Sequence, residues 1–358
     1  MPMLADQVDA VIGVDTHHDT HTASIVTPLG AELAHLQAPA DAAGYEALLD
    51  FARTHAPGPR MVWALEGTRS HGTGLARALQ DCGERVVEVD RPKRPVRKRG
   101  KSDPIDATRA ARDALTQERL AEPRADGARE ELRVLLVARD HHARMRTATV
   151  NTFKAFLLTA PEPLRAQFRG MPTTAQIVHA AGLDAAEQAD DAVLTATLAQ
   201  LAGVVRMLDT FLAANKTQLT ALTSAWMPEL PAEFGIGPVA AAQLLVSWSH
   251  PGRCRSGAAF AMLAGTAPLP ASSGRVTRHR LNRGGDRQLN RALHIIAIHR
   301  LRHDPRTRDY ADRRRAAGST DRETRRCLKN YLARHLWRVM EHHQPAGGPV
   351  PAPEYTAA

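Results

Sequence analysis

The chain has 358 residues, of which 43% are hydrophobic, and a formal net charge of +9 at pH 7. This length and composition indicate a folded protein of two or three domains with buried cores, and exclude a disordered chain. No stretch of roughly 18 apolar residues is evident, and the N-terminus lacks the charged-then-apolar order of a secretory signal. We therefore expect a cytoplasmic protein without membrane contact, and clustered arginine favours nucleic acid as its partner.

Residues 1–125 alternate predicted strands and helices. Apolar runs at 9–15, 21–26, 31–37, 61–67 and 85–90 predict strands, and residues 42–55 and 72–82 predict helices. The resulting order is βββαβαβ, followed by a helix that begins near Asp103. This order matches a mixed sheet of the ribonuclease H type, in which the first strand is central and carboxylates gather at strand ends.

Four acids in this segment are candidate metal ligands. Asp15 ends the first predicted strand, Glu66 ends the fourth, and Asp103 and Asp106 lie at the start of the helix that follows the sheet. Carboxylate oxygens are ligands that Mg²⁺ prefers, and two bound ions can activate attack at a phosphodiester. Each acid alone also fits a loop or helix cap. Together they predict a site for Mg²⁺, with Mn²⁺ as the alternative.

A basic run lies directly before this helix and predicts a surface for nucleic acid. Ser102, Asp103 and Pro104 suit the start of a helix, which accounts for the aspartate but not for the cations. Cations beside a carboxylate site steer a polyphosphate toward bound metal. The basic residues counted as binding candidates are Lys93, Arg94, Arg97, Lys98, Arg99 and Lys101.

Residues 126–228 are predicted to be helical, with a heptad seam as the main feature. The seam residues are Leu194, Leu198, Leu201, Val205, Leu208, Leu212, Asn215, Leu219 and Leu222. A helix packed within one subunit and an intermolecular coiled coil both fit this spacing. Asn215 favours the second, because a lone polar seam residue commonly fixes strand number. We therefore expect a homo-oligomer.

Residues 229–343 are predicted to form a mainly helical C-terminal domain. Gly235 and Gly237 lie in a turn that runs into a helix, as in helix-hairpin-helix elements that aim backbone N–H groups at phosphate. Arginine-rich helices follow. Residues 344–358, rich in Pro, Gly and Ala, predict a disordered tail.

Three further patterns leave alternatives open. The stretch DTHHDTH, with His17, His18, Asp19 and His21, fits a transition-metal cluster or, more simply, a solvated turn. The stretch ASSGRVTRHR fits a flexible loop, or a serine nucleophile at Ser272 or Ser273. In the second case nearby arginines would stabilise developing charge on phosphate. These are Arg275, Arg278, Arg280 and Arg283. The cysteines Cys82, Cys254 and Cys327 form no CxxC pair and predict reduced, buried thiols.

Five motifs in this order resemble the DEDD transposases of insertion-sequence family one-ten. They are VIGVDTHHDTHTASIV, ALEGTRSHGTGLARAL, KSDPIDATRAARDAL, FGIGPVAAAQLL and LAGTAPLPASSGRVTRHRLNRGGDRQLNRAL. By that resemblance Asp15, Glu66, Asp103 and Asp106 match the acids of a RuvC-like domain, and Ser273 matches the serine nucleophile. The resemblance also implies a dimer or tetramer, and a structured bridge RNA that pairs with donor and target DNA. After the glutamate the chain departs from the family pattern, with Arg69 and Ser70 following Thr68.

The leading hypothesis is an RNA-guided DNA recombinase of a prokaryotic nucleoid, which breaks and rejoins DNA through a phosphoserine link. A metal-dependent junction-resolving nuclease would need the acids but no serine. A nucleic-acid-binding protein without enzymatic activity would need neither.

Overall fold

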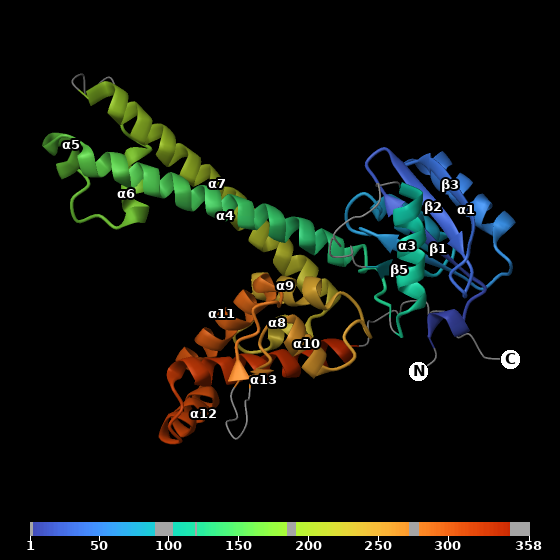
Figure 1. The fold of residues 1–358 in the computed structure, drawn as a ribbon. Helices are drawn as coiled ribbons and strands as arrows, with labels where there is room; N and C mark the ends of the chain where they lie inside the picture. The colour runs from blue at the N-terminus through green and yellow to red at the C-terminus, as the bar shows by residue number, and fades with distance from the viewer. Residues whose placement is uncertain (1–2, 90–102, 119, 185–190, 272–278, 344–358) are drawn as a thin grey trace. The chain divides into compact units, whose positions relative to one another are not determined.

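The computed structural model describes residues 3–89, 103–118, 120–184, 191–271 and 279–343, and Figure 1 labels their helices and strands. The basic run at 93–101, Ser272, Ser273, Arg275, Arg278 and the tail lie outside these residues. The chain divides into two compact units, Met1–Arg124 and Ala125–Ala358, which are described in turn. A further boundary near residue 228 stays a prediction.

The first unit is built on a five-stranded mixed sheet. Its strands are β1 (Ala10–Thr16), β2 (Thr20–Val26), β3 (Glu32–Pro39), β4 (Met61–Glu66) and β5 (Val86–Val89), in the order β3-β2-β1-β4-β5. β1 pairs antiparallel with β2 and parallel with β4, and β5 continues the parallel half. The helices are α1 (Ala42–His55), α2 (Thr73–Asp81) and α3 (Asp103–Leu115). The predicted element order and the central first strand are confirmed.

Alternate side chains of the sheet pack against different helices. Ile12 and Trp63 belong to a buried cluster that also contains Leu48 of α1 and Leu75 of α2. Neighbouring strand residues face the other way, into a cluster that contains Ala110 and Ala111 of α3. Because strand side chains alternate between faces, odd-numbered residues of β1 point toward α3. Asp15 is one of them.

The second unit begins with a pair of long helices, α4 (Ala128–Thr159) and α7 (Ala192–Trp226), which run side by side in Figure 1. The short helices α5 (Glu162–Ala166) and α6 (Thr173–Ala180) lie between them in sequence. The predicted seam lies on α7, and Leu198, Val205, Leu208, Asn215 and Leu219 are buried there.

Asn215 has hydrogen-bond partners within the chain, so it does not by itself favour an intermolecular coiled coil, and the homo-oligomer stays a prediction. Asn215 Nδ2 donates to the carbonyl oxygen of Leu135 on α4 at 2.9 Å, and Arg139 Nη1 of α4 donates to Asn215 Oδ1 at 3.4 Å. The polar seam residue is therefore satisfied within one chain.

The sequence expectation about apolar stretches also needs correction, because α7 is long and apolar enough by length and composition to cross a membrane. That test is weak evidence, since core helices of soluble proteins pass it too.

The rest of the second unit packs its helices around a core that also includes Leu132 of α4 and Leu219 of α7. These elements are α8 (Glu229–Ala232), α9 (Pro238–Trp248), α10 (Gly257–Leu263), α11 (Arg287–His303), α12 (Pro305–Ala316) and α13 (Asp321–Glu341), with a short strand pair β6 (Leu269–Pro270) and β7 (His279–Arg280). Leu245 of α9, Phe260 of α10, Leu293 of α11 and Leu336 of α13 are fully buried in this core. The expected mixed α/β and helical composition is confirmed.

The predicted glycine turn leads into a helix, since Gly237 is the N-cap of α9. Gly235 has a φ of +82°, and a Cβ there would lie 3.2 Å from the ring of His299 on α11, so this glycine turn is shaped by packing within the chain. Phosphate binding at this turn stays a prediction. All three cysteines are free, but only Cys254 is buried, while Cys82 is exposed and Cys327 is half-buried.

Candidate active site

Two of the predicted acids lie at the ends of neighbouring parallel strands. β1 and β4 are in register from Ala10 and Met61 to Val14 and Leu65, and each strand then continues into an acid, Asp15 and Glu66. Thr16 Oγ1 donates to the carbonyl oxygen of Glu66 at 3.0 Å, which ties the two strand ends together. Asp15 is 7% exposed, and Glu66 is half-buried. Both acids therefore lie at the same end of the sheet, where the parallel strands β1 and β4 finish.

Helix α3 packs directly on the backbone of β1, and Gly13 makes this approach possible. A Cβ at Gly13 would lie 2.1 Å from the Ala107 carbonyl oxygen and 2.6 Å from the Ala111 nitrogen. Such distances exclude any side chain, so the helix is in backbone contact with the strand two residues before Asp15. The glycine thus sets how closely α3 approaches the strand that carries the acid.

Polar contacts fix the direction of α3 across the sheet. Thr108 Oγ1 lies 2.8 Å from Ser24 Oγ, and Ser24 pairs with Gly13 in the middle of the sheet. One turn later, Arg112 Nε donates at 2.9 Å to the carbonyl oxygen of Gly30, in the turn after β2. This turn adjoins the beginning of β1, because Val26 pairs with Val11. The N-terminus of α3 therefore points toward the end of β1 where Asp15 lies.

The two remaining acids belong to that N-terminal turn. Asp103 is the first residue of α3, as the sequence predicted, and its side chain is outside the described set. Asp106 is half-buried, and its Oδ1 lies 3.6 Å from Arg109 Nη1. Among the side chains that the structure describes, no three His, Cys, Asp or Glu residues form a metal-binding group. The fold brings the acids to one end of the unit, and their hard oxygen donors suit Mg²⁺.

The histidines after Asp15 do not form the alternative metal cluster. His17 Nε2 lies 3.2 Å from Asp15 Oδ2, whereas His18 and Asp19 contact each other on the exposed turn. His21 is buried and stacks on Tyr45, with ring centroids 5.8 Å apart. Burial lowers the pKa of the His21 imidazole, and positive charge on His17 and His71 lowers it further. The solvated-turn interpretation is correct for His18 and Asp19 but not for His21.

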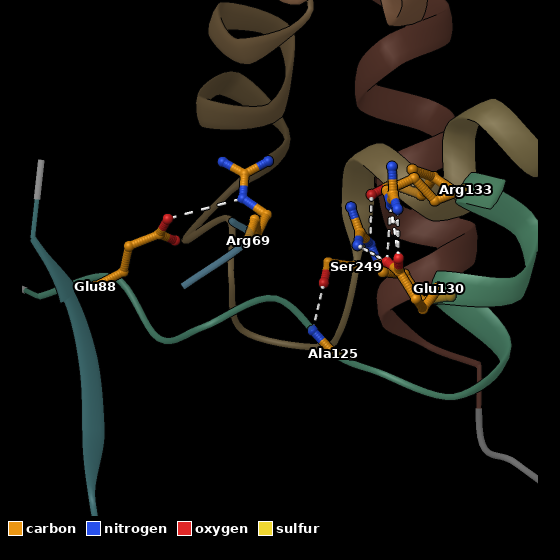
Figure 2. Close-up of polar contacts among 8 residues, drawn as sticks. Arg69, Glu88, Ala125, Glu130, Arg133 and Ser249 are labelled. Atoms are coloured by element: carbon orange, nitrogen blue, oxygen red, sulfur yellow. Dashed lines mark hydrogen bonds and ion pairs between the residues drawn. The ribbon is translucent and has the colours of Figure 1, made fainter. Parts of the chain in front are cut away.

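The segment after Glu66 is held by an ion pair that sequence reasoning missed. Figure 2 shows the guanidinium of Arg69 pointing toward Glu88 of β5, with Nε and Oε1 3.7 Å apart. Arg69 occupies a position where the chain departs from the family pattern. The pair links the loop that follows one candidate acid to the edge strand.

In the second unit, Figure 2 shows how the start of α4 is fastened. Ser249, which has a φ of +75° after α9, accepts a hydrogen bond from the Ala125 nitrogen at 3.0 Å. Arg129 is buried, and its Nη1 donates to Glu130 at 3.0 Å, while Arg133 contacts the same carboxylate. Arg133 lowers the pKa of Glu130. These contacts are structural.

The serine loop itself lies outside the described residues, but its two flanking strands are described. β6 and β7 pair antiparallel, with Leu269 opposite Arg280, so residues 269 and 280 bring the two ends of the loop together. Arg280 is exposed on β7, and Arg283 lines a cavity with arginines of α11 and α13. The further arginines of α11 and α13 were not named as candidates from the sequence. The regular spacing of arginines over residues 321–341 was a signal that could have identified those on α13.

Both parts of the chain match family models of transposases. Residues 12–160 match the DEDD transposase model of the IS110 family, described as "Transposase", and residues 230–312 match the model described as "Transposase IS116/IS110/IS902 family". Two separate stretches of the chain are thus each similar to a transposase model of the IS110 family. The first match contains Asp15, Glu66, Asp103 and Asp106, and the second contains Ser273.

Two curated relatives are similar over shorter stretches. The "Insertion element IS110 uncharacterized 43.6 kDa protein" of Streptomyces coelicolor is 38% identical over 110 residues, covering 30% of this chain and 27% of that protein. The "Insertion element IS900 uncharacterized 42 kDa protein" of Mycobacterium paratuberculosis is 34% identical over 85 residues, covering 24% of this chain and 21% of the relative. The matched regions thus span about a quarter of each relative.

Proposed function

We propose that this chain cleaves and rejoins DNA as the transposase of its own insertion element. The observation that supports this proposal is the backbone contact between Gly13 and α3, a helix whose first turn begins on the side of the sheet where β1 and β4 end in Asp15 and Glu66. A RuvC-like nuclease site needs such acids from separate elements at one place. We further propose that the site works with Mg²⁺ and that a structured RNA from the element guides a homo-oligomer to donor and target DNA.

In this proposal the acids and a serine divide the chemistry. Ser273 Oγ attacks the scissile phosphorus, a serine–phosphorus ester forms, and the bond from phosphorus to the leaving DNA oxygen breaks. The leaving oxygen takes up a proton as a DNA hydroxyl. In rejoining, a DNA hydroxyl attacks the same phosphorus, and Ser273 leaves and regains its proton. Mg²⁺ held by Asp15, Glu66, Asp103 and Asp106 would supply positive charge for the phosphate oxygens.

The test combines end-labelled element DNA with Mg²⁺, the protein and RNA transcribed from the noncoding DNA beside the reading frame. Denaturing electrophoresis should show a covalent protein–DNA adduct in wild type and in Ser272→Ala, and none in Ser273→Ala. Asp106→Asn should slow cleavage by about 10²-fold or more, because an amide is a poor magnesium ligand. Asp113→Asn, the same change two turns further along α3, is the matched control and should cleave normally.

Two outcomes would redirect the proposal. Free cleaved ends in both wild type and Ser273→Ala, with no adduct, would indicate a hydrolytic junction nuclease. Full activity in Asp106→Asn would remove this carboxylate from the site.

A further inference from the structure

A cationic cavity of about 740 Å³ lies in the second unit, bounded by α11, α13 and the loop between β7 and α11. Five arginines, one lysine and one histidine line it. The α13 members are Arg322, Arg325, Arg326 and Lys329, at positions i, i+3, i+4 and i+7. Side chains at this spacing share one helix face, so α13 presents a continuous ladder of cations to the cavity.

Among the described residues, carboxylates offset this charge only in part: Asp321 attracts Arg325 and Glu323 attracts Arg326, but neither acid lines the cavity. No Asp or Glu lines the cavity, and no ion pair joins its arginines or Lys329 to an acid, whereas Arg291 and Arg300 of α11 each have one. Nearby acids are engaged elsewhere. Asp286 caps α11 and accepts from Ser247 Oγ at 2.8 Å, and Asp321 pairs with Arg315 at 2.7 Å. The cations that line the cavity still repel one another, as Arg326 and Arg325 repel Lys329, and a bound anion would relieve that repulsion.

Lys329 is held in place on the cavity wall. Its Nζ donates to Asn290 Oδ1 at 2.7 Å, and Asn290 Nδ2 donates to the Ala264 carbonyl oxygen at 2.7 Å. The ammonium is thus fixed through α11 to the end of α10. Burial lowers the pKa of Lys329, and Arg326 and Arg325 lower it further. The same causes, burial and then Lys329 and Arg325, lower the pKa of His294 across the cavity.

The loop wall of the cavity is fixed by two glycines in backbone contact. A Cβ at Gly285 would lie 2.3 Å from the Gly265 nitrogen and 2.4 Å from its Cα, so no side chain fits there. Gly265 has a φ of +64°, a conformation that favours glycine. Asn282 Nδ2 also donates to the Met262 carbonyl oxygen at 3.1 Å. These contacts therefore fix the backbone of the loop that contains Arg283.

We propose that this cavity binds the phosphodiester backbone of a DNA strand. The ladder from Arg322 to Lys329 extends about 10 Å along α13, which is longer than one small anion and suits successive phosphates. Arginine forks match phosphate oxygens in pairs, and a positioned lysine adds a point charge. The choice of DNA rests on the proposed function, whereas the binding of a polyanion rests on the cavity alone.

The test measures binding without catalysis. Full-length protein in EDTA is titrated into a labelled single-stranded DNA of about 20 nucleotides, long enough to exceed the site of one small binding domain, at several salt concentrations. Arg322→Gln/Arg326→Gln changes two exposed lining residues. This variant should bind at least about 10-fold more weakly and lower the salt slope by about 1.4, because each lost single-strand phosphate contact removes about 0.7.

Arg302→Gln/Arg313→Gln is the matched control, since both side chains are exposed and neither lines the cavity. It should keep the wild-type affinity and slope. Lys329→Gln, checked by circular dichroism for folding, should weaken binding as well. Asp106→Asn should bind normally, so loss of cleavage there tests the proposed function without touching this inference.

Three results would overturn the inference. Equal losses in the cavity and control variants would indicate diffuse surface charge, and an unchanged cavity variant would place the DNA elsewhere. If single-stranded RNA of the same sequence loses affinity in the cavity variant while DNA does not, the ligand is RNA.

Discussion

Replacing Gly13 by alanine tests whether the position of α3 controls the candidate active site. Its Cβ would lie 2.1 Å from the Ala107 carbonyl oxygen, whereas ordinary contact begins at 3.4 Å, so α3 must retreat by about 1.3 Å or the strand must bend. Overpacking of this kind costs about 1–3 kcal/mol of stability. A displacement of about 1 Å at catalytic groups lowers rates by about 10²-fold. We therefore expect Gly13→Ala to be destabilised and nearly inactive.

The assay is single-turnover cleavage of element DNA with Mg²⁺, together with urea unfolding of the same preparation. Gly203→Ala is the matched control, because Gly203 lies on α7 and a Cβ there meets nothing within 4 Å. Alanine should stabilise that helix by up to about 1 kcal/mol and leave cleavage unchanged. If Gly13→Ala loses stability but its folded fraction cleaves at the wild-type rate, α3 does not position the acids. Unchanged stability would refute the packing argument itself.

The remaining predictions concern single buried groups and the basic run. Asn215→Leu should leave the oligomeric state unchanged in light scattering, because the partners of Asn215, Leu135 and Arg139, lie in the same chain. The free energy of unfolding in urea should shift by only about 1 kcal/mol. A change in oligomeric state would instead support the intermolecular coiled coil. His21 is fully buried, and its pKa is lowered in the folded chain. As the pH drops below about 6.5, the unfolded chain therefore takes up the imidazole proton before the folded chain does. The free energy of unfolding then decreases by up to about 1.4 kcal/mol per pH unit. His21→Leu should flatten that slope in urea titrations, and identical slopes would contradict the linkage. Lys98→Ala/Arg99→Ala/Lys101→Ala should lower the salt slope of RNA binding by about 2, and an unaltered slope would place that surface elsewhere.

The sheet was predictable because its strands are short apolar runs with clear ends. Asp15 and Glu66 could be located from sequence, since each directly ends a buried run. The close packing of α3 on β1 was not predictable, because the missing side chain at Gly13 has meaning only once Ala107 is seen against it.

Helix α7 shows the same limit in another form. The heptad spacing correctly indicated a long helix with a buried face, but a seam does not say which helix covers it. The partner is α4, about 80 positions away in sequence at the Leu135–Asn215 contact. The cationic cavity likewise depends on residues of α11 and α13 that meet only through folding. The periodicity of apolar residues does not determine which distant segments pack together.

The α4–α7 pair joins two separate hydrophobic clusters, and this has a consequence for cooperativity. Phe153, Phe168 and Leu198 lie in one cluster, whereas Leu132 and Leu219 belong to the core shared with α9 and α11. Between them the helices are held partly by polar contacts, such as the Arg146–Asp209 ion pair. Regions with few buried apolar contacts open locally at lower free energy than a core. Amide hydrogens near residue 160 should therefore exchange through an opening of their own, while those of α9 exchange only when the larger core unfolds.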